Sequence, residues 1–191
     1  GTDAVRFTLA VSAAPGSDIS LSEERIAGYR AFANKIWNAA RFILMKGVEF
    51  DGRPPQIASL EDRWMFSRLN RVTEEMETAL GAYRFHEAAH LLYHFFWHEF
   101  CDWYIELKKL DSSEASWRNL LAVFERALRL LHPFMPFITE ELWQRLAGGE
   151  RPGGRSIALE PYPRAEATWR DPEAERQMAA LQEAIVHVRN I

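Results

Sequence analysis

The chain has 191 residues, 48% of them hydrophobic and 13% aromatic, which excludes a disordered segment and suits one large domain or one domain with an appendage. Its single cysteine excludes an intramolecular disulfide and fits a reducing cytoplasm, and no apolar run reaches the ~18 residues that span a bilayer. The net charge of −4 excludes a general polyanion binder, but residues 25–71 hold nine Lys and Arg against four Asp and Glu, as in a local RNA contact or a solvated polar face.

Capping and turn signals divide the chain into helices with short connections. Ser20 with Glu23 reads as a capping box, Ser113 as an N-cap and Pro136 as a first-turn residue. The predicted helices cover residues 2–14, 20–46, 59–80, 83–109, 114–131, 136–146 and 172–191. Because the connections are short, we expect neighbouring helices to be antiparallel, as in a bundle.

A glycine-rich stretch at 148–154 marks the main boundary of the chain. After it, Ser156–Leu159 reads as a strand-like edge. The last helix places apolar residues at alternating three- and four-residue steps, which suits either a docked helix or the start of a coiled coil. These residues are Ala174, Met178, Leu181, Ile185 and Val188.

One aromatic residue of the second helix, Phe42, faces away from the predicted core. On a helical wheel it lies roughly 80° outside the apolar arc that contains Phe32 and Ile36. Its neighbours there are cations and amides, which suit a base stack with phosphate and base-edge contacts. The alternative is that Phe42 packs against a neighbouring helix. The polar neighbours are Lys35, Lys46, Asn38, Asn34 and Arg41.

The fourth helix contains the zinc-protease pattern H-E-x-x-H, from His86 to His90. On a helix the two histidines stand one turn apart, and Glu87 could polarise a zinc-bound water. No third ligand follows at the usual spacing, and the histidines trace the more polar side of the helix. We therefore expect structural or surface histidines, with a zinc site as the alternative.

Two glutamates, Glu99 and Glu106, fall inside the apolar arc of the same helix. A buried carboxylate needs a partner, so we expect ion pairs with Arg68 or Arg71, the alternative being a catalytic carboxylate pair. Cys101 reads as a small buried hydrophobe rather than a nucleophile, because no residue is placed to orient a base beside it. The sequence thus carries no convincing active site.

Four segments, spread in order over nearly the whole chain, carry a family resemblance. Together they resemble the anticodon-binding region of bacterial valyl-tRNA synthetases, class I enzymes. The segments N-A-A-R-F and F-C-D-W-Y select valine, whereas the Pro-x-x-Pro segment is shared with the isoleucine, leucine and methionine enzymes. The four segments are Gly1–Phe7, Phe32–Phe42, Trp97–Glu106 and Leu131–Trp143.

The resemblance implies an all-α fold, an antiparallel helical bundle with a small irregular appendage. It implies a connection from a catalytic domain at 1–20, the bundle at 21–147, and a distal appendage with a truncated terminal helix at 148–191. The family's catalytic core, editing domain and C-terminal coiled coil would lie outside this piece, which starts at Gly1 rather than Met. The piece itself would then be no enzyme and hold no cofactor or metal, whereas the parent valine–tRNA ligase would use ATP and Mg.

The resemblance also implies the binding role. Valine anticodons share A and C as their last two bases, and in the family an aromatic at the position of Phe42 stacks against the anticodon. Ile105 matches a second family contact region. The implied partners are tRNA for valine and the catalytic domain of the same chain, in a cytoplasmic monomer without membrane contact. A helical protein-interaction module remains the alternative class. The predicted RNA-binding residues are Phe42, Asn38, Arg41, Lys35, Asn34, Lys46 and Ile105.

Overall fold

The computed structural model is a helical bundle, and no strand occurs in the part of the chain that it describes. It describes residues 1–14, 16, 21–45, 47, 52–111, 113–146 and 155–189. The helices are α1 Thr2–Ser12, α2 Glu23–Leu44, α3 Leu60–Gly81, α4 Phe85–His94, the π-helical segment η1 Phe95–Tyr104, α5 Ile105–Lys108, α6 Glu114–Leu131, α7 Pro136–Leu146 and α8 Pro172–Arg189.

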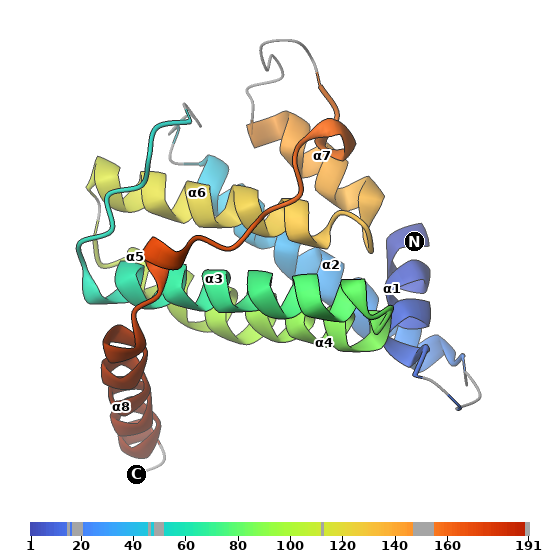
Figure 1. Ribbon diagram of the computed structural model, residues 1–191, viewed down its shortest axis with the longest axis horizontal. Coiled ribbons are helices and arrows are strands. Elements are labelled where there is room, and N and C mark those ends of the chain that lie inside the picture. The colour runs from blue at the N-terminus through green and yellow to red at the C-terminus, as the bar shows by residue number, and fades with distance from the viewer. Residues whose placement is uncertain are drawn as a thin grey trace.

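Apart from α8, the long helices run roughly along the longest axis of the molecule, with α1 and α7 towards one end (Figure 1). Serine caps begin three of them: Ser22, Ser59 and Ser113 each accept a hydrogen bond from the backbone N–H three residues on. The predicted capping box at Ser20 is wrong, since the cap is Ser22, two residues later; Ser20 itself lies outside the described residues.

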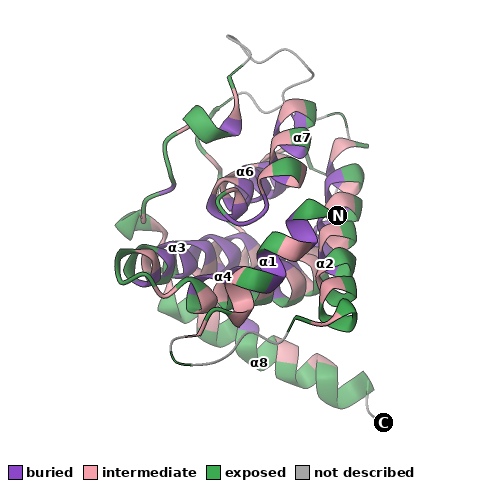
Figure 2. Ribbon diagram, turned by 90° about the vertical axis from the view of Figure 1, so that its right-hand side faces the viewer, coloured by how far each residue is buried: buried purple, intermediate pink, exposed green. Residues whose placement is uncertain are grey.

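The core is unusually aromatic and runs through the centre of the bundle, where the buried faces of α3 and α6 meet those of α1, α2 and α4 (Figure 2). Phe32, Phe96, Phe100 and Phe124 are fully buried and form a chain of ring contacts with centroid distances of 5.7–6.5 Å. Such contacts fix the relative positions of α2, η1 and α6.

The predicted fourth helix is continuous in space but contains the π-helical segment Phe95–Tyr104. Glu99 lies inside the bundle, where Arg68 donates two hydrogen bonds to it at 2.8 and 2.9 Å, confirming the predicted partner. The burial predicted for Glu106 is wrong: it is exposed and pairs with Lys109 at 2.6 Å. A π-helix turns less per residue than an α-helix, so an α-helical count misplaces the residues that follow it.

The C-terminal segment runs across the bundle and ends in α8, which projects from it (Figure 1). Ala174 and Met178 are buried against the bundle, and Arg71 binds Glu175 at 2.8 Å, so the first half of α8 is a docked helix. The predicted strand-like edge is wrong: residues Ile157–Leu159 form a 3₁₀ turn, because Ser156 caps it through a hydrogen bond from Ala158. Among the described helices, none has the length and apolar character to cross a membrane.

Candidate nucleic-acid interface

One side of α2 presents a row of exposed polar residues, here called the α2 stripe. Its members occur at three- and four-residue intervals, so they line up along the helix, and each is exposed to solvent. The row offers two guanidinium groups and two amides to solvent, a composition that suits phosphates and base edges. The α2 stripe consists of Arg30, Asn34, Asn38 and Arg41.

Phe42 borders the α2 stripe and is half-buried. Its ring packs against Trp117 of α6, with centroids 5.2 Å apart and planes tilted by 54°. This contact agrees with the alternative prediction that Phe42 packs against a neighbouring helix. Lys109, just after α5, places its Nζ 5.5 Å from the centre of the same ring. The aromatic ring is therefore anchored on one helix and electrostatically attracted to a cation from another.

Two of the other predicted contact residues are not free, exposed groups in the described structure. Lys35 bonds Asp102 at 2.5 Å and lies 4.1 Å from the centre of the Trp97 ring, so its charge is already compensated. Ile105 is only 6% exposed and belongs to the core, which leaves it little surface for a ligand. Lys46 lies outside the described residues.

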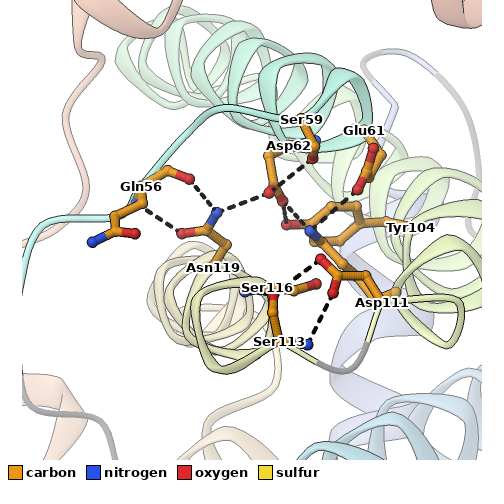
Figure 3. Close-up of polar contacts among 10 residues, drawn as sticks. Gln56, Ser59, Glu61, Asp62, Tyr104, Asp111, Ser113, Ser116 and Asn119 are labelled. Atoms are coloured by element: carbon orange, nitrogen blue, oxygen red, sulfur yellow. Dashed lines mark hydrogen bonds and ion pairs between the residues drawn. The ribbon is translucent and has the colours of Figure 1, made fainter.

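A polar network is buried where α3, α5 and α6 meet (Figure 3). The carboxylate of Asp62 accepts hydrogen bonds from the Tyr104 hydroxyl at 2.5 Å and from Asn119 Nδ2 at 2.8 Å. The fully buried Lys108 places its Nζ 2.5 Å from the same carboxylate. Asn119 also bonds both backbone groups of Gln56, at 3.0 and 2.8 Å, and so fixes the segment that precedes α3.

The network lies close in sequence to both groups that contact Phe42. Lys108 immediately precedes Lys109, and Asn119 follows Trp117 by two residues. Burial, and next the Asp62 carboxylate, raise the pKa of Tyr104 well above 10, so its hydroxyl remains a hydrogen-bond donor. Through Asp62 the network ties α3 to Tyr104, Lys108 and Asn119, whose elements carry or adjoin the residues around Phe42.

The histidines of α4 and η1 are not gathered into a metal centre. His94 lies 3.2 Å from Glu99 and His98 lies 3.5 Å from Asp102, each beside one carboxylate. Within the described ranges, no group of three or more His, Cys, Asp or Glu is placed to hold a metal ion. Burial raises the pKa of Cys101 to about 12, so the thiol is protonated at neutral pH and is not a nucleophile.

Comparison with known proteins identifies the family. The profile of the anticodon-binding domain of tRNA ligases matches residues 62–191, more than half of the chain. The chain belongs to this anticodon-binding family. Its relatives include the valine–tRNA ligases of Solibacter usitatus, 54% identical over 193 residues, and of Geobacter sulfurreducens, 52% identical over 202 residues. In both cases all of the chain is covered but only 22% of the relative.

The fold of the anticodon-binding domain recurs in a solved structure. The LeuRS–tRNA–LeuAMS ternary complex of Agrobacterium radiobacter superposes with a TM-score of 0.70, covering 90% of this chain and 20% of that one. The sequence identity is 21%, so the likeness is one of fold. The expected all-α bundle is thus confirmed.

Sequence reasoning missed two features of this anticodon-binding domain. Lys109 gave no distinguishing signal, since a lysine at a helix C-terminus is common for its effect on the helix dipole. Trp37 lies within the apolar arc of the helical wheel, yet it is only half-buried, and the guanidinium of Arg145 lies 4.9 Å from its ring centre. A wheel of one helix cannot reveal a cation supplied by another.

Proposed function

We propose that this domain binds the anticodon loop of tRNA for valine. The whole protein would be a valine–tRNA ligase, in which a catalytic portion uses ATP and Mg to attach valine to that tRNA. Support comes from the family match together with relatives of 43–54% identity that are named valine–tRNA ligases. We further propose that the protein works as a cytoplasmic monomer, with the domain packed on the catalytic portion of the same chain.

The observation that carries the proposal is the placement of Phe42 beside the α2 stripe. A half-buried ring anchored on Trp117 can stack a base without first being ordered. Asn38 and Asn34, both exposed, offer donors and acceptors to the edges of the shared A and C bases. Arg41 is exposed on the same row and suits a phosphate.

The predicted cation Lys35 and the newly found cation Lys109 take different places in the proposal. Lys35 would reach a phosphate only by exchanging its bond to Asp102, so we assign it a secondary role. Lys109, whose ammonium already lies over the Phe42 ring, replaces buried Ile105 as the contact on the opposite wall.

The test is a titration of an RNA hairpin carrying a valine anticodon against the same hairpin with its A and C exchanged. Wild type and Phe42→Leu are compared at low salt, leucine being chosen because it keeps an apolar contact with Trp117. Loss of base stacking, about 1–3 kcal/mol, weakens binding of the valine hairpin about 5- to 150-fold. The preference for the valine hairpin over the exchanged one should shrink in parallel.

Phe85→Leu is the matched control, because Phe85 is 43% exposed at the start of α4 and its ring contacts Tyr83 rather than a residue of the α2 stripe. It should leave both affinities within twofold of wild type. Equal, salt-sensitive binding of both hairpins by the wild type would reduce the interface to a basic patch. Affinity for a protein partner with none for RNA would favour an interaction module instead.

A further inference from the structure

A second pairing of a cation with an aromatic ring borders the α2 stripe on its other edge. The guanidinium carbon of Arg145, from α7, lies 4.9 Å from the centre of the Trp37 ring. Arg145 also binds Glu141 one turn earlier, with Nε at 2.8 Å and an Nη at 2.6 Å from the same oxygen. Both charged side chains are 52% exposed, so the stack lies at the surface rather than in the core.

The two edges of the α2 stripe are built alike. On a wheel, Phe42 lies roughly 40° beyond Asn38, and Trp37 lies roughly 20° beyond Arg30 on the opposite edge. Each half-buried ring carries a cation from another element, Lys109 at 5.5 Å and Arg145 at 4.9 Å. An exposed polar row with such a pairing on both sides fits a ligand that crosses the helix.

We infer that the Arg145–Trp37 stack is a second nucleotide subsite for single-stranded RNA. The inference rests on the proposed function, because it extends the same bound loop from Phe42 across the α2 stripe to α7. A guanidinium group held against an indole ring presents its outer face to a base and its N–H groups to a phosphate. This contact is independent of base identity, so it adds affinity rather than selectivity.

The ion pair with Glu141 does not block the subsite. Exposed pairs at i,i+4 spacing on a helix contribute little, so an RNA phosphate can replace the carboxylate. Trp37 keeps Arg145 at the edge of the stripe during the exchange. Along α2, Trp37 and Phe42 are five residues apart, a rise of about 7.5 Å, so a loop stacked at both must pass over Asn38 and Arg41 between them.

The test is a titration of the valine-anticodon hairpin with Arg145→Gln and Arg145→Lys. Arg145→Gln should weaken binding at least about fivefold and by the same factor for the exchanged hairpin, and should reduce the magnitude of the salt slope of log K by about 0.7. Arg145→Lys should recover the salt slope but only part of the affinity, because an ammonium has no planar face. Thermal melting checks that each variant is folded.

Arg176→Gln is the matched control, since Arg176 pairs with Glu173 one turn away on α8 and is 72% exposed. It should bind as wild type does. If Arg145→Gln also binds within twofold of wild type while Phe42→Leu binds weakly, the Arg145–Trp37 stack does not bind RNA and serves only in packing. The proposed function would still hold in that case. If the wild type itself does not prefer the valine hairpin, the proposed function fails first, and the subsite falls with it.

Discussion

A buried ammonium group lies at the centre of the polar network, and its energetics are asymmetric. Removing Asp62 leaves the buried ammonium of Lys108 with only the more distant carboxylate of Glu61, at 3.6 Å, whereas removing Lys108 leaves Asp62 with the donors of Tyr104 and Asn119. We therefore predict that Asp62→Ala lowers the free energy of unfolding by about 3–5 kcal/mol, and Lys108→Met by only about 1–3 kcal/mol. Urea unfolding followed by tryptophan fluorescence measures both.

Glu106→Gln is the control for these variants, because Glu106 forms an exposed pair with Lys109. It should change stability by less than about 1 kcal/mol. A Lys108→Met variant less stable than Asp62→Ala would contradict the view that the carboxylate is held mainly by neutral donors.

Cys101 couples stability to pH through its buried thiol. Its pKa is raised to about 12 by burial, against 9.0 for the free group. Between these values the unfolded chain loses the thiol proton and the folded chain keeps it, so the free energy of unfolding falls as pH rises from about 9 to 12. Cys101→Ala should lose this part of the decline in urea titrations, and the native thiol should react slowly with Ellman's reagent at pH 8. Fast reaction of the native protein would contradict the raised pKa.

At the scale of single residues, the sequence predicted the ion-pair partner of a buried carboxylate, but it did not predict the contacts of Phe42. The ion pair of Glu99 with Arg68 followed from the cost of burying a carboxylate, which is local chemistry. The partners of Phe42, Lys109 and Trp117, come from two other elements, so no property of α2 alone could supply them. The role of Phe42 in binding RNA stays a prediction.

At the scale of the element, most helix boundaries could be predicted because their signals are local. The helices Glu114–Leu131 and Pro136–Leu146 begin and end where Ser113, Pro133 and Pro136 predict. The π-helical segment Phe95–Tyr104 could not be predicted, because no signal in its sequence was found that separates it from an α-helix. Glu99 is inside, as the α-helical count predicts, whereas Glu106, after the change of register, is outside.

The segment after the glycine-rich stretch shows the limit of reading elements one by one. Its polar residues are used to bind it to the bundle: Asp171 accepts from Arg63 at 2.8 Å, and Glu175 accepts from Ser67 at 2.6 Å. The hydrogen bond from Arg63, and next the one from the backbone N–H of Ala174, lower the pKa of Asp171. These contacts span more than a hundred residues of sequence, so the apolar spacing of the last helix could suggest docking but not where it docks.

For the whole molecule, intramolecular ion pairs reduce the number of basic residues that are free to attract RNA. Of the nine cations between residues 25 and 71, Arg63, Arg68 and Arg71 are paired with carboxylates of the same chain, namely Asp171, Glu99 and Glu175. Residues 25–71 therefore present less positive charge to solvent than their composition alone indicates. The cations placed around the α2 stripe are Arg30, Arg41, Lys109 and Arg145.

This distribution predicts a shallow salt dependence for binding of the valine-anticodon hairpin. Each neutralised phosphate of a single strand contributes about 0.7 to the slope of log K against log salt, so four cations limit the slope to about −3. Titrations across a series of KCl concentrations measure it. With a net charge of −4, the rest of the surface repels RNA and should add nothing to the slope. A slope of about −5 or steeper would mean that RNA is held by an extended basic surface rather than by the two edges of α2.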